Sequence, residues 1–293
     1  MCQVTRLFLG LLIFSPLGAM AQDFANIEIS TTPVRNSIYM LQGSGGNIGV
    51  LVGDDGALIV DDQYGPLTDK ITAAIAELTD LPVEYVINTH FHYDHSDGNE
   101  NFGRAGAVIV AHDRSRDRMQ IVQIVGAGNR VQEPYDEVGL PKLTFLDALR
   151  LYYNGNAIDV FYSGDGHTDG DAQVYFRTAN VIHTGDQFVR YGLPFIDRPN
   201  GGTMEGMIDS LWQIAGMIDD ETIIIPGHGQ LADRNDLLEF RDMLVTIRGR
   251  ITTGIADGQS VAQVISSNPA RGYADNSEST ASWIRDAYGE YSP

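Results

Sequence analysis

The chain has 293 residues, 43% of them hydrophobic, and its 39 acidic against 19 basic side chains give a formal net charge of −20. Such a chain can bury a large core as one folded unit. Its acidity disfavours nucleic-acid phosphates and anionic membranes as partners, because like charges repel. The single cysteine, Cys2, lies at the very start, so the remainder can form neither disulfides nor thiolate metal sites.

Residues 1–21 are expected to be a secretory signal peptide. A short positive region at Arg6 precedes the largely apolar stretch Leu7–Leu17, and Ala19-Met20-Ala21 forms a small-x-small cleavage site before Gln22. The apolar stretch is short for a membrane-spanning helix, although an N-terminal anchor or a buried helix is the alternative. We therefore expect a periplasmic or secreted bacterial protein that has no membrane attachment after cleavage.

Strands and helices alternate along the rest of the chain. Hydrophobic periodicity and turn residues predict strands at Ser37–Gln42, Ile48–Val52, Ala57–Val60, Val83–Ile87, Val108–Ala111, Lys142–Phe145, Leu149–Tyr153, Ala157–Tyr162, Val174–Arg177, Val181–Thr184 and Thr222–Ile225. Helices are predicted at Leu67–Leu78, from Gly98–Phe102, and at Asp113–Val125, Met204–Met217, Leu237–Ile251 and Ser260–Ser266. Gly126–Pro141 lacks periodicity and is expected to be a loop over or beside the site. The alternation predicts one α/β domain over residues 22–293, with sheets facing inside, helices outside and a C-terminal helical extension from about residue 233.

A cluster of ligand-type side chains follows the apolar run Val83–Ile87. His90, His92, Asp94 and His95 occupy four of six consecutive positions. Imidazole suits zinc, iron, copper or nickel, and a carboxylate adds a hard ligand. A lone His-x-His pair would be an unremarkable surface feature, but this density predicts a metal site that needs at least one more ligand from elsewhere.

Three later loops each offer one further ligand after a short apolar strand. These residues are His167, Asp186 and His228, and glycines flank each of them. Two other histidines, His112 and His183, have no place in this pattern. We expect them to be structural rather than adjacent to the substrate.

The series His-x-His-x-Asp-His, then His, Asp and His, resembles the signature of the metallo-β-lactamase superfamily over roughly residues 35–232. The resemblance implies a four-layer αβ/βα sandwich with the metal site at one edge of the two facing sheets. It implies one ion held by His90, His92 and His167, a second held by Asp94, His95 and His228, and Asp186 bridging both. It further implies that Asp61, after the strand Ala57–Val60, accepts a hydrogen bond from a ligand histidine, with a turn or cap role as the alternative.

Parts of the signature depart from true β-lactamases. Val160–Thr168 is similar to the matching lactamase segment, but the largest lactamase subclass has cysteine in place of Asp186 and arginine in place of His95. A bridging aspartate is typical of the superfamily's thioesterases, lactonases and phosphodiesterases. The substrate is therefore left open among lactams, lactones, esters and thioesters.

The implied chemistry is metal-assisted hydrolysis. Two divalent ions lower the pKa of a shared water from about 15.7 towards 7, which creates a hydroxide nucleophile for a carbonyl. Asp94 is expected to be catalytic by orienting this water and relaying its proton. Two Zn²⁺ are the leading cofactors, with iron or manganese as alternatives. The expectation is an exported binuclear zinc hydrolase of a small molecule with at least weak β-lactamase activity. Its alternatives are a lactonase or thioesterase, a mononuclear-iron oxidoreductase resembling persulfide dioxygenases, and a metal-binding protein without catalysis.

Two further residues are tentative contacts of the substrate. Tyr93 lies inside the metal loop, with a packed aromatic role as the alternative. Arg190, four positions after Asp186, could engage a substrate carboxylate, although a surface salt bridge is favoured. The sequence does not indicate the oligomeric state.

Overall fold

The computed structural model describes residues 24–125 and 130–292. The predicted signal peptide, Met1–Ala21, lies outside these residues. Within the described part, no helix combines the length and the apolar character that crossing a bilayer requires.

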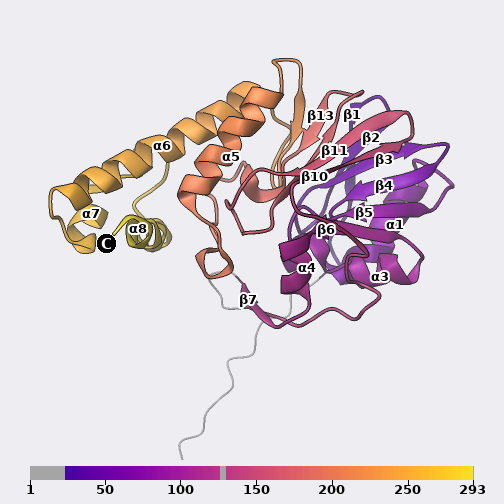
Figure 1. The fold of residues 1–293 in the computed structure, drawn as a ribbon, viewed down its shortest axis with the longest axis horizontal. Coiled ribbons are helices and arrows are strands. Elements are labelled where there is room, and N and C mark those ends of the chain that lie inside the picture. Colours follow the sequence, from indigo (N-terminus) through magenta and orange to yellow (C-terminus); the bar gives the residue numbers. More distant parts are fainter. Residues whose placement is uncertain (1–23, 126–129, 293) are drawn as a thin grey trace, which may run out of the picture.

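Two β-sheets form the centre of the molecule (Figure 1). The first has the order β1-β2-β3-β4-β5-β6-β9, and its strands are β1 Ser30–Arg35, β2 Ile38–Gln42, β3 Ile48–Gly53, β4 Gly56–Val60, β5 Val83–Ile87, β6 Val108–His112 and β9 Leu143–Phe145. The second has the order β10-β11-β12-β13-β14, with β10 Ala148–Tyr153, β11 Asn156–Tyr162, β12 Ala172–Phe176, β13 Val181–His183 and β14 Ile223–Ile225. In a separate two-stranded sheet, β7 Gln123–Val125 pairs antiparallel with β8 Arg130–Gln132.

Alternation along the strands explains why two layers of helices are needed. In β4, Leu58 and Val60 pack between the sheets, whereas Ala57 and Ile59 belong to a second core on the outer face. Successive strand residues point to opposite faces, so a strand that is apolar throughout must be covered on both sides. The first sheet is therefore covered by α1 Thr68–Ala76, whose Ile71 enters the outer core.

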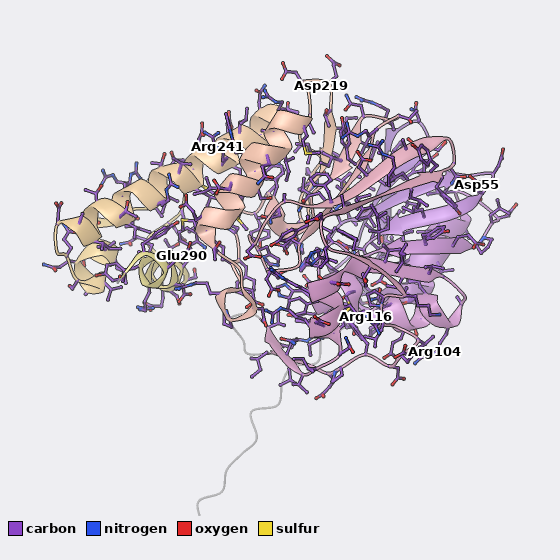
Figure 2. All side chains as sticks on the ribbon, viewed as in Figure 1. Asp55, Arg104, Arg116, Asp219, Arg241 and Glu290 are labelled. Carbon is purple, nitrogen blue, oxygen red and sulfur yellow. The ribbon has the colours of Figure 1, made fainter. Side chains whose placement is uncertain are left out.

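The remaining helices complete a four-layer αβ/βα sandwich, as predicted (Figure 1). Near the first sheet lie α2 Tyr93–Ser96, α3 Asn99–Arg104 and α4 Asp113–Met119. The second sheet is covered by α5 Met204–Met217, and beyond it lie α6 Arg234–Ala256, α7 Val261–Ser267 and α8 Glu278–Tyr291. Three short 3₁₀ turns are η1 Gly65–Leu67, η2 Gly185–Gln187 and η3 Arg198–Asn200. Charged side chains such as Asp55 and Asp219 project from the rim of the molecule (Figure 2).

The structure differs from the sequence predictions in several places. Within Gly126–Pro141, predicted as a loop, Arg130–Gln132 forms the strand β8, and residues 126–129 lie outside the described part of the chain. The predicted helix Asp113–Val125 ends at Met119, and Gln123–Val125 is the strand β7. The residues beyond Met119 are rich in β-branched isoleucine and valine, which favour strands, and Val125 packs into a small core with Phe91. Strand β1 was missed because Ser30–Arg35 is polar and contains a proline, both common on an edge strand. Helix α8 lies within the predicted C-terminal helical extension but was not predicted as a separate helix.

Strand direction brings the candidate ligands together. Strands β4, β5 and β6 are parallel, and β11, β13 and β14 run in a common direction within the second sheet. The carboxyl ends of parallel strands lie at one edge of a sheet. Asp61 follows β4 and His90 follows β5, while His167, Asp186 and His228 follow β11, β13 and β14.

Candidate metal centre

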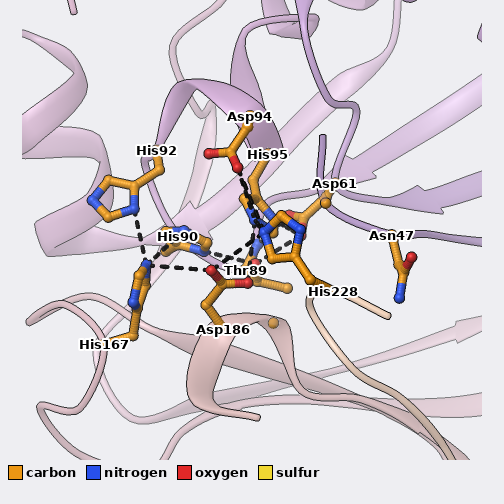
Figure 3. Close-up of polar contacts among 12 residues, drawn as sticks. Asn47, Asp61, Thr89, His90, His92, Asp94, His95, His167, Asp186 and His228 are labelled. Atoms are coloured by element: carbon orange, nitrogen blue, oxygen red, sulfur yellow. Dashed lines mark hydrogen bonds and ion pairs between the residues drawn. The ribbon is translucent and has the colours of Figure 1, made fainter. Parts of the chain in front are cut away.

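All seven predicted ligands lie together at the edge of the two sheets (Figure 3). Their nitrogen and oxygen atoms form three groups, and the atoms of each group lie within 4.8 Å of one another. The groups are His90, His92 and His167; His90, His95 and Asp186; and Asp94, His95 and His228. The first sheet supplies four of these side chains and the second supplies three, so the centre spans both halves of the sandwich.

The first group presents free nitrogens to a common point. His92 is held through Nε2 by Asp197 Oδ2 at 2.8 Å, and His167 Nδ1 donates to the carbonyl of Phe195 at 2.8 Å. The opposite nitrogens converge: His167 Nε2 lies 2.9 Å from His92 Nδ1 and 3.2 Å from His90 Nε2. A neutral imidazole that donates through one nitrogen presents a lone pair at the other. Converging lone pairs repel one another unless a cation lies among them, so this group fits a metal ion.

Asp186 reaches towards both sets of ligands. Its Oδ1 lies 3.2 Å from His95 Nε2, while its Oδ2 lies 3.5 Å from His228 Nε2 and 3.7 Å from His167 Nε2. The carboxylate is only 7% exposed, and Oδ1 has no hydrogen-bond partner among the described residues. A buried carboxylate oxygen without a donor is costly, which is a second observation that fits a bound cation here.

The electrostatics of the site differ between its two sides. Burial and the neighbouring histidines hold the pKa of His90 well below its usual range, and burial lowers the pKa of His167 to about 4. Although burial alone would lower it, the pKa of His95 is raised because Asp186 and Asp61 lie close by. Burial would raise the pKa of Asp186, but His228 and His95 hold it well below its usual range. His90 and His167 are thus held neutral and Asp186 is held ionised, which are the forms that bind metals, whereas without a metal the nearby carboxylates favour the protonated ring of His95.

Asp61 supports the cluster as predicted. Its Oδ2 accepts from His95 Nδ1 at 2.7 Å and from the Thr89 hydroxyl at 2.8 Å, while its Oδ1 accepts from the Thr89 backbone N–H at 2.7 Å. Its φ of +65° lies in the left-handed region, which is rare for a residue with a Cβ and is typical of functional sites.

Close backbone approach requires glycine at two positions. A Cβ on Gly46 would lie 2.1 Å from Cε1 of His95, and one on Gly227 would lie 2.0 Å from Oδ1 of Asp186. Neither distance is sterically possible. The loops that carry these glycines can therefore close over the ligands only without a side chain.

Sequence reasoning missed two residues that position ligands. Asp197, which orients His92, lies in an irregular stretch without any periodic signal. Asn47 donates through Nδ2 to the carbonyls of Pro226 and Gly229, on either side of the loop that carries His228. Their roles depend on contacts between segments 105 to 182 residues apart, which local patterns do not reveal.

The two unassigned histidines have structural contacts. His183 Nε2 donates to the carbonyl of Asn47 at 3.0 Å. His112 caps α4 by accepting from the Arg114 backbone N–H, and its Nε2 donates to the carbonyl of Leu146 at 2.8 Å. Both sets of contacts agree with the structural interpretation.

The two residues predicted to contact the substrate have other partners. The ring of Tyr93 lies under the guanidinium of Arg130, whose Cζ is 3.8 Å from the ring centroid, and beside the ring of Tyr64. Arg190 forms an ion pair with Asp236 of α6, the salt bridge that the sequence favoured. Their roles towards a substrate stay predictions.

A family model described as the metallo-beta-lactamase superfamily matches residues 41–228, so the chain belongs to this superfamily. Its predicted fold class is thereby confirmed. Members are metal-dependent hydrolases.

Individual relatives span several activities. The chain is 25% identical over 164 residues to a hydroxyacylglutathione hydrolase of Pelagibacter ubique, covering 56% of this chain and 59% of the relative. It is 23% identical to a metallo-beta-lactamase type 2 of Bacillus cereus, covering 67% of this chain and 71% of the relative.

Two solved structures show the same fold. The DIM-1 metallo-beta-lactamase has a TM-score of 0.62 at 19% identity, covering 75% of this chain and 99% of that one. The sec-alkylsulfatase Pisa1 of Pseudomonas sp. has a TM-score of 0.69 at 15% identity, covering 90% and 50%. At such identities the likeness concerns the fold alone.

Proposed function

We propose that this protein is an exported hydrolase that uses two metal ions, zinc in the first place, to open a carbonyl bond of a small molecule, with at least weak β-lactamase activity. The observation that carries the proposal is the position of Asp186, whose two oxygens face both groups of histidines. His90, His92 and His167 would hold one ion and Asp94, His95 and His228 the other, with Asp186 shared between them.

The chemistry divides between the ions and the chain. When bound, two divalent ions supply a water of lowered pKa and polarise the substrate carbonyl. Asp94 would orient this water and accept its proton, a role supported by its partly exposed carboxylate (23%) and by the 3.5 Å between its Oδ2 and His228 Nε2. Asp61 and Asp197 fix the orientation of His95 and His92.

The substrate is tested by direct comparison. Purified protein that lacks residues 1–21 is assayed with a chromogenic cephalosporin, with zinc or with chelator, beside a panel of lactones and thioesters that includes a hydroxyacylglutathione. Chelator-sensitive cephalosporin turnover at or above the rest supports a lactamase. Activity confined to lactones or thioesters removes the lactamase assignment and favours the second candidate, a lactonase or thioesterase. Two observations support that candidate: the aspartate at position 186, between the two groups of histidines, and the similarity to a hydroxyacylglutathione hydrolase.

Two measurements separate the other candidates. Iron in the purified protein together with oxygen uptake on a persulfide would replace the hydrolase by an iron oxidoreductase. We expect the variant Asp94→Asn to keep its metal-dependent fold and to lose nearly all turnover. A protein that only binds metal would show no turnover to lose.

Export is tested separately. We expect the protein in the periplasm or the medium, with a mature N-terminus at Gln22. Retention of Met1 in a cytoplasmic fraction would overturn this part of the proposal.

A further inference from the structure

The segment Tyr191–Phe195 connects the metal centre to the C-terminal helices. On one side, the ring centroid of Tyr191 lies 5.7 Å from that of His228, and the ring centroid of Phe195 lies 5.7 Å from that of His167. On the other side, the indole Nε1 of Trp283 in α8 donates to the carbonyl of Pro194 at 2.6 Å. The same few residues therefore contact candidate ligands and the helical extension.

A cleft of about 440 Å³ lies between this segment and the start of α8. Its lining includes four aromatic side chains, a leucine and a carboxylate, which are Tyr191, Phe195, Tyr273, Trp283, Leu193 and Asp275. Tyr191 lines the cleft and is 53% exposed, and its ring is also the one that lies beside His228 of the metal centre. Pockets of this volume are within the range that binds small molecules.

The lining of the cleft carries one formal charge, the carboxylate of Asp275, and behind the lining the Cζ of Arg250 lies 5.9 Å from the centroid of the Tyr273 ring. Oδ1 of Asp275 accepts from the hydroxyls of Ser277 at 2.6 Å and Thr280 at 3.2 Å, and these hydrogen bonds hold its pKa below the usual range. No lysine or arginine is among the described residues that line the cleft. Arg190, directly before Tyr191, is already paired with Asp236. Aromatic faces and a carboxylate attract apolar and cationic groups and disfavour anions.

We propose that this cleft is a substrate subsite, which binds an apolar or aromatic arm carrying a neutral or cationic end while the carbonyl to be cleaved lies at the metal centre. The inference rests on the proposed function and narrows its substrate class. It assigns the C-terminal extension a role in specificity through Tyr273, in the turn between α7 and α8, and Trp283 of α8.

Binding is measured with Trp283 as a reporter. The chain has two tryptophans, and the other, Trp212, is 61% exposed on α5 beside Arg241. In the Trp212→Phe background we expect saturable quenching of Trp283 fluorescence by benzyltrimethylammonium, with roughly tenfold weaker quenching by phenylmethanesulfonate and an intermediate effect of benzyl alcohol. The variant Asp275→Asn should reduce the preference for the cation. Equal affinities for the three probes, or no saturable quenching, overturn the proposal.

Selectivity is measured with N-acetylcysteamine thioesters that differ only in the acyl group. The acetyl ester lacks an arm, the phenylacetyl ester has a neutral one, and the 4-(trimethylammonio)phenylacetyl ester has a cationic one. We expect Tyr273→Ala to lower the ratio of kcat/KM for the arylated esters to that for the acetyl ester by about five- to tenfold. The control Tyr152→Ala, which removes a 74% exposed tyrosine from β10, should leave the ratio unchanged. An unchanged ratio in Tyr273→Ala overturns the subsite.

The two proposals fail differently. If no thioester, lactone or cephalosporin is turned over in a chelator-sensitive way, the proposed function is wrong and the substrate role of the cleft falls with it. If the acetyl ester is turned over but the arms have no effect, only the subsite is wrong. The fluorescence titration decides whether the cleft binds a ligand in either case.

Discussion

Asp61 shows how much of this site rests on residues that hold the ligands. Its left-handed backbone costs about 1–3 kcal/mol, which the surrounding contacts must offset. Those contacts come from the Thr89 N–H and hydroxyl and from the ring of His95. The carboxylate therefore fixes two neighbouring segments and the tautomer of one ligand at once.

The variant Asp61→Asn tests this role. An amide presents one acceptor oxygen instead of two, so it cannot satisfy both the Thr89 donors and His95 Nδ1. We expect zinc affinity to fall by about 10- to 100-fold while the fold is kept. Competition with a chromophoric chelator measures the affinity, and Asp54→Asn, in an exposed turn, is the matched control. Equal affinities of Asp61→Asn and the control would contradict the role.

His112 adds a pH dependence to stability. Burial lowers its pKa below the usual 6.5, and its contacts require the neutral ring, since Nδ1 accepts from Arg114 and Nε2 donates to Leu146. The unfolded chain binds a proton as pH falls through about 6.5, whereas the folded chain does not. The contribution of His112 is therefore present above pH 6.5 and declines on acidification.

The variant His112→Asn keeps a cap for α4 and removes the titration. We expect it to cost about 1–2 kcal/mol of unfolding free energy at pH 8, through the lost bond to Leu146, and less at pH 5.5. Urea unfolding of both proteins at the two pH values gives the difference. If the difference in unfolding free energy between the two proteins is the same at pH 8 and pH 5.5, His112 does not take up its proton only in the unfolded chain, and the prediction is wrong.

At the scale of elements, the loops after the strands are shaped around the ligands. Gly227 follows β14 and precedes His228, and it leaves room for Oδ1 of Asp186. We expect Gly227→Ala to displace this carboxylate and to lower kcat/KM at least 100-fold, because an added Cβ would lie 2.0 Å from it. Gly249→Ala in α6, where a Cβ meets nothing within 4 Å, should keep activity and gain up to about 1 kcal/mol of stability. Similar turnover of the two variants would refute the steric argument.

Local patterns were sufficient for the elements that carry ligands. The apolar runs before His90 and His228 predicted β5 and β14. Between the predicted strands Leu149–Tyr153 and Ala157–Tyr162, the pair Asn154-Gly155 is typical of a hairpin turn, and both residues have positive φ. The pattern was insufficient beyond Met119, where an apolar stretch suits either a helix or a strand until a pairing partner is known. The ligand groups themselves came from the resemblance, and Asp197 and Asn47 stayed hidden because only the tertiary structure brings them to the site.

At the scale of the whole molecule, the candidate centre lies across the seam between the two sheets. His95 and His228 lie 133 residues apart in sequence, yet their Nε2 atoms are 3.2 Å apart. A bound ion would therefore connect both halves of the sandwich and stabilise only the folded state.

Metal removal should thus lower stability as well as activity. At free zinc roughly 1,000-fold above Kd, binding contributes about 4 kcal/mol to folding. A change of 1 kcal/mol corresponds to about 2–4 °C in Tm for a domain approaching this size, so we expect chelator to lower Tm by about 8–16 °C. Thermal unfolding with zinc, with chelator, and after zinc is restored measures the effect. A Tm independent of chelator would argue against a metal at the seam.

The core that α6, α7 and α8 share with α5 and the second sheet has an evolutionary consequence. Leu237, Leu244 and Ile284 of the extension are buried in the same cluster as Met207 and Leu211 of α5. A lineage that lost the extension would expose this face to water, so deletion would have to be accompanied by several apolar-to-polar replacements on α5. We therefore expect the C-terminal helices to be inherited together with the surface that they cover, rather than exchanged between relatives as an independent unit.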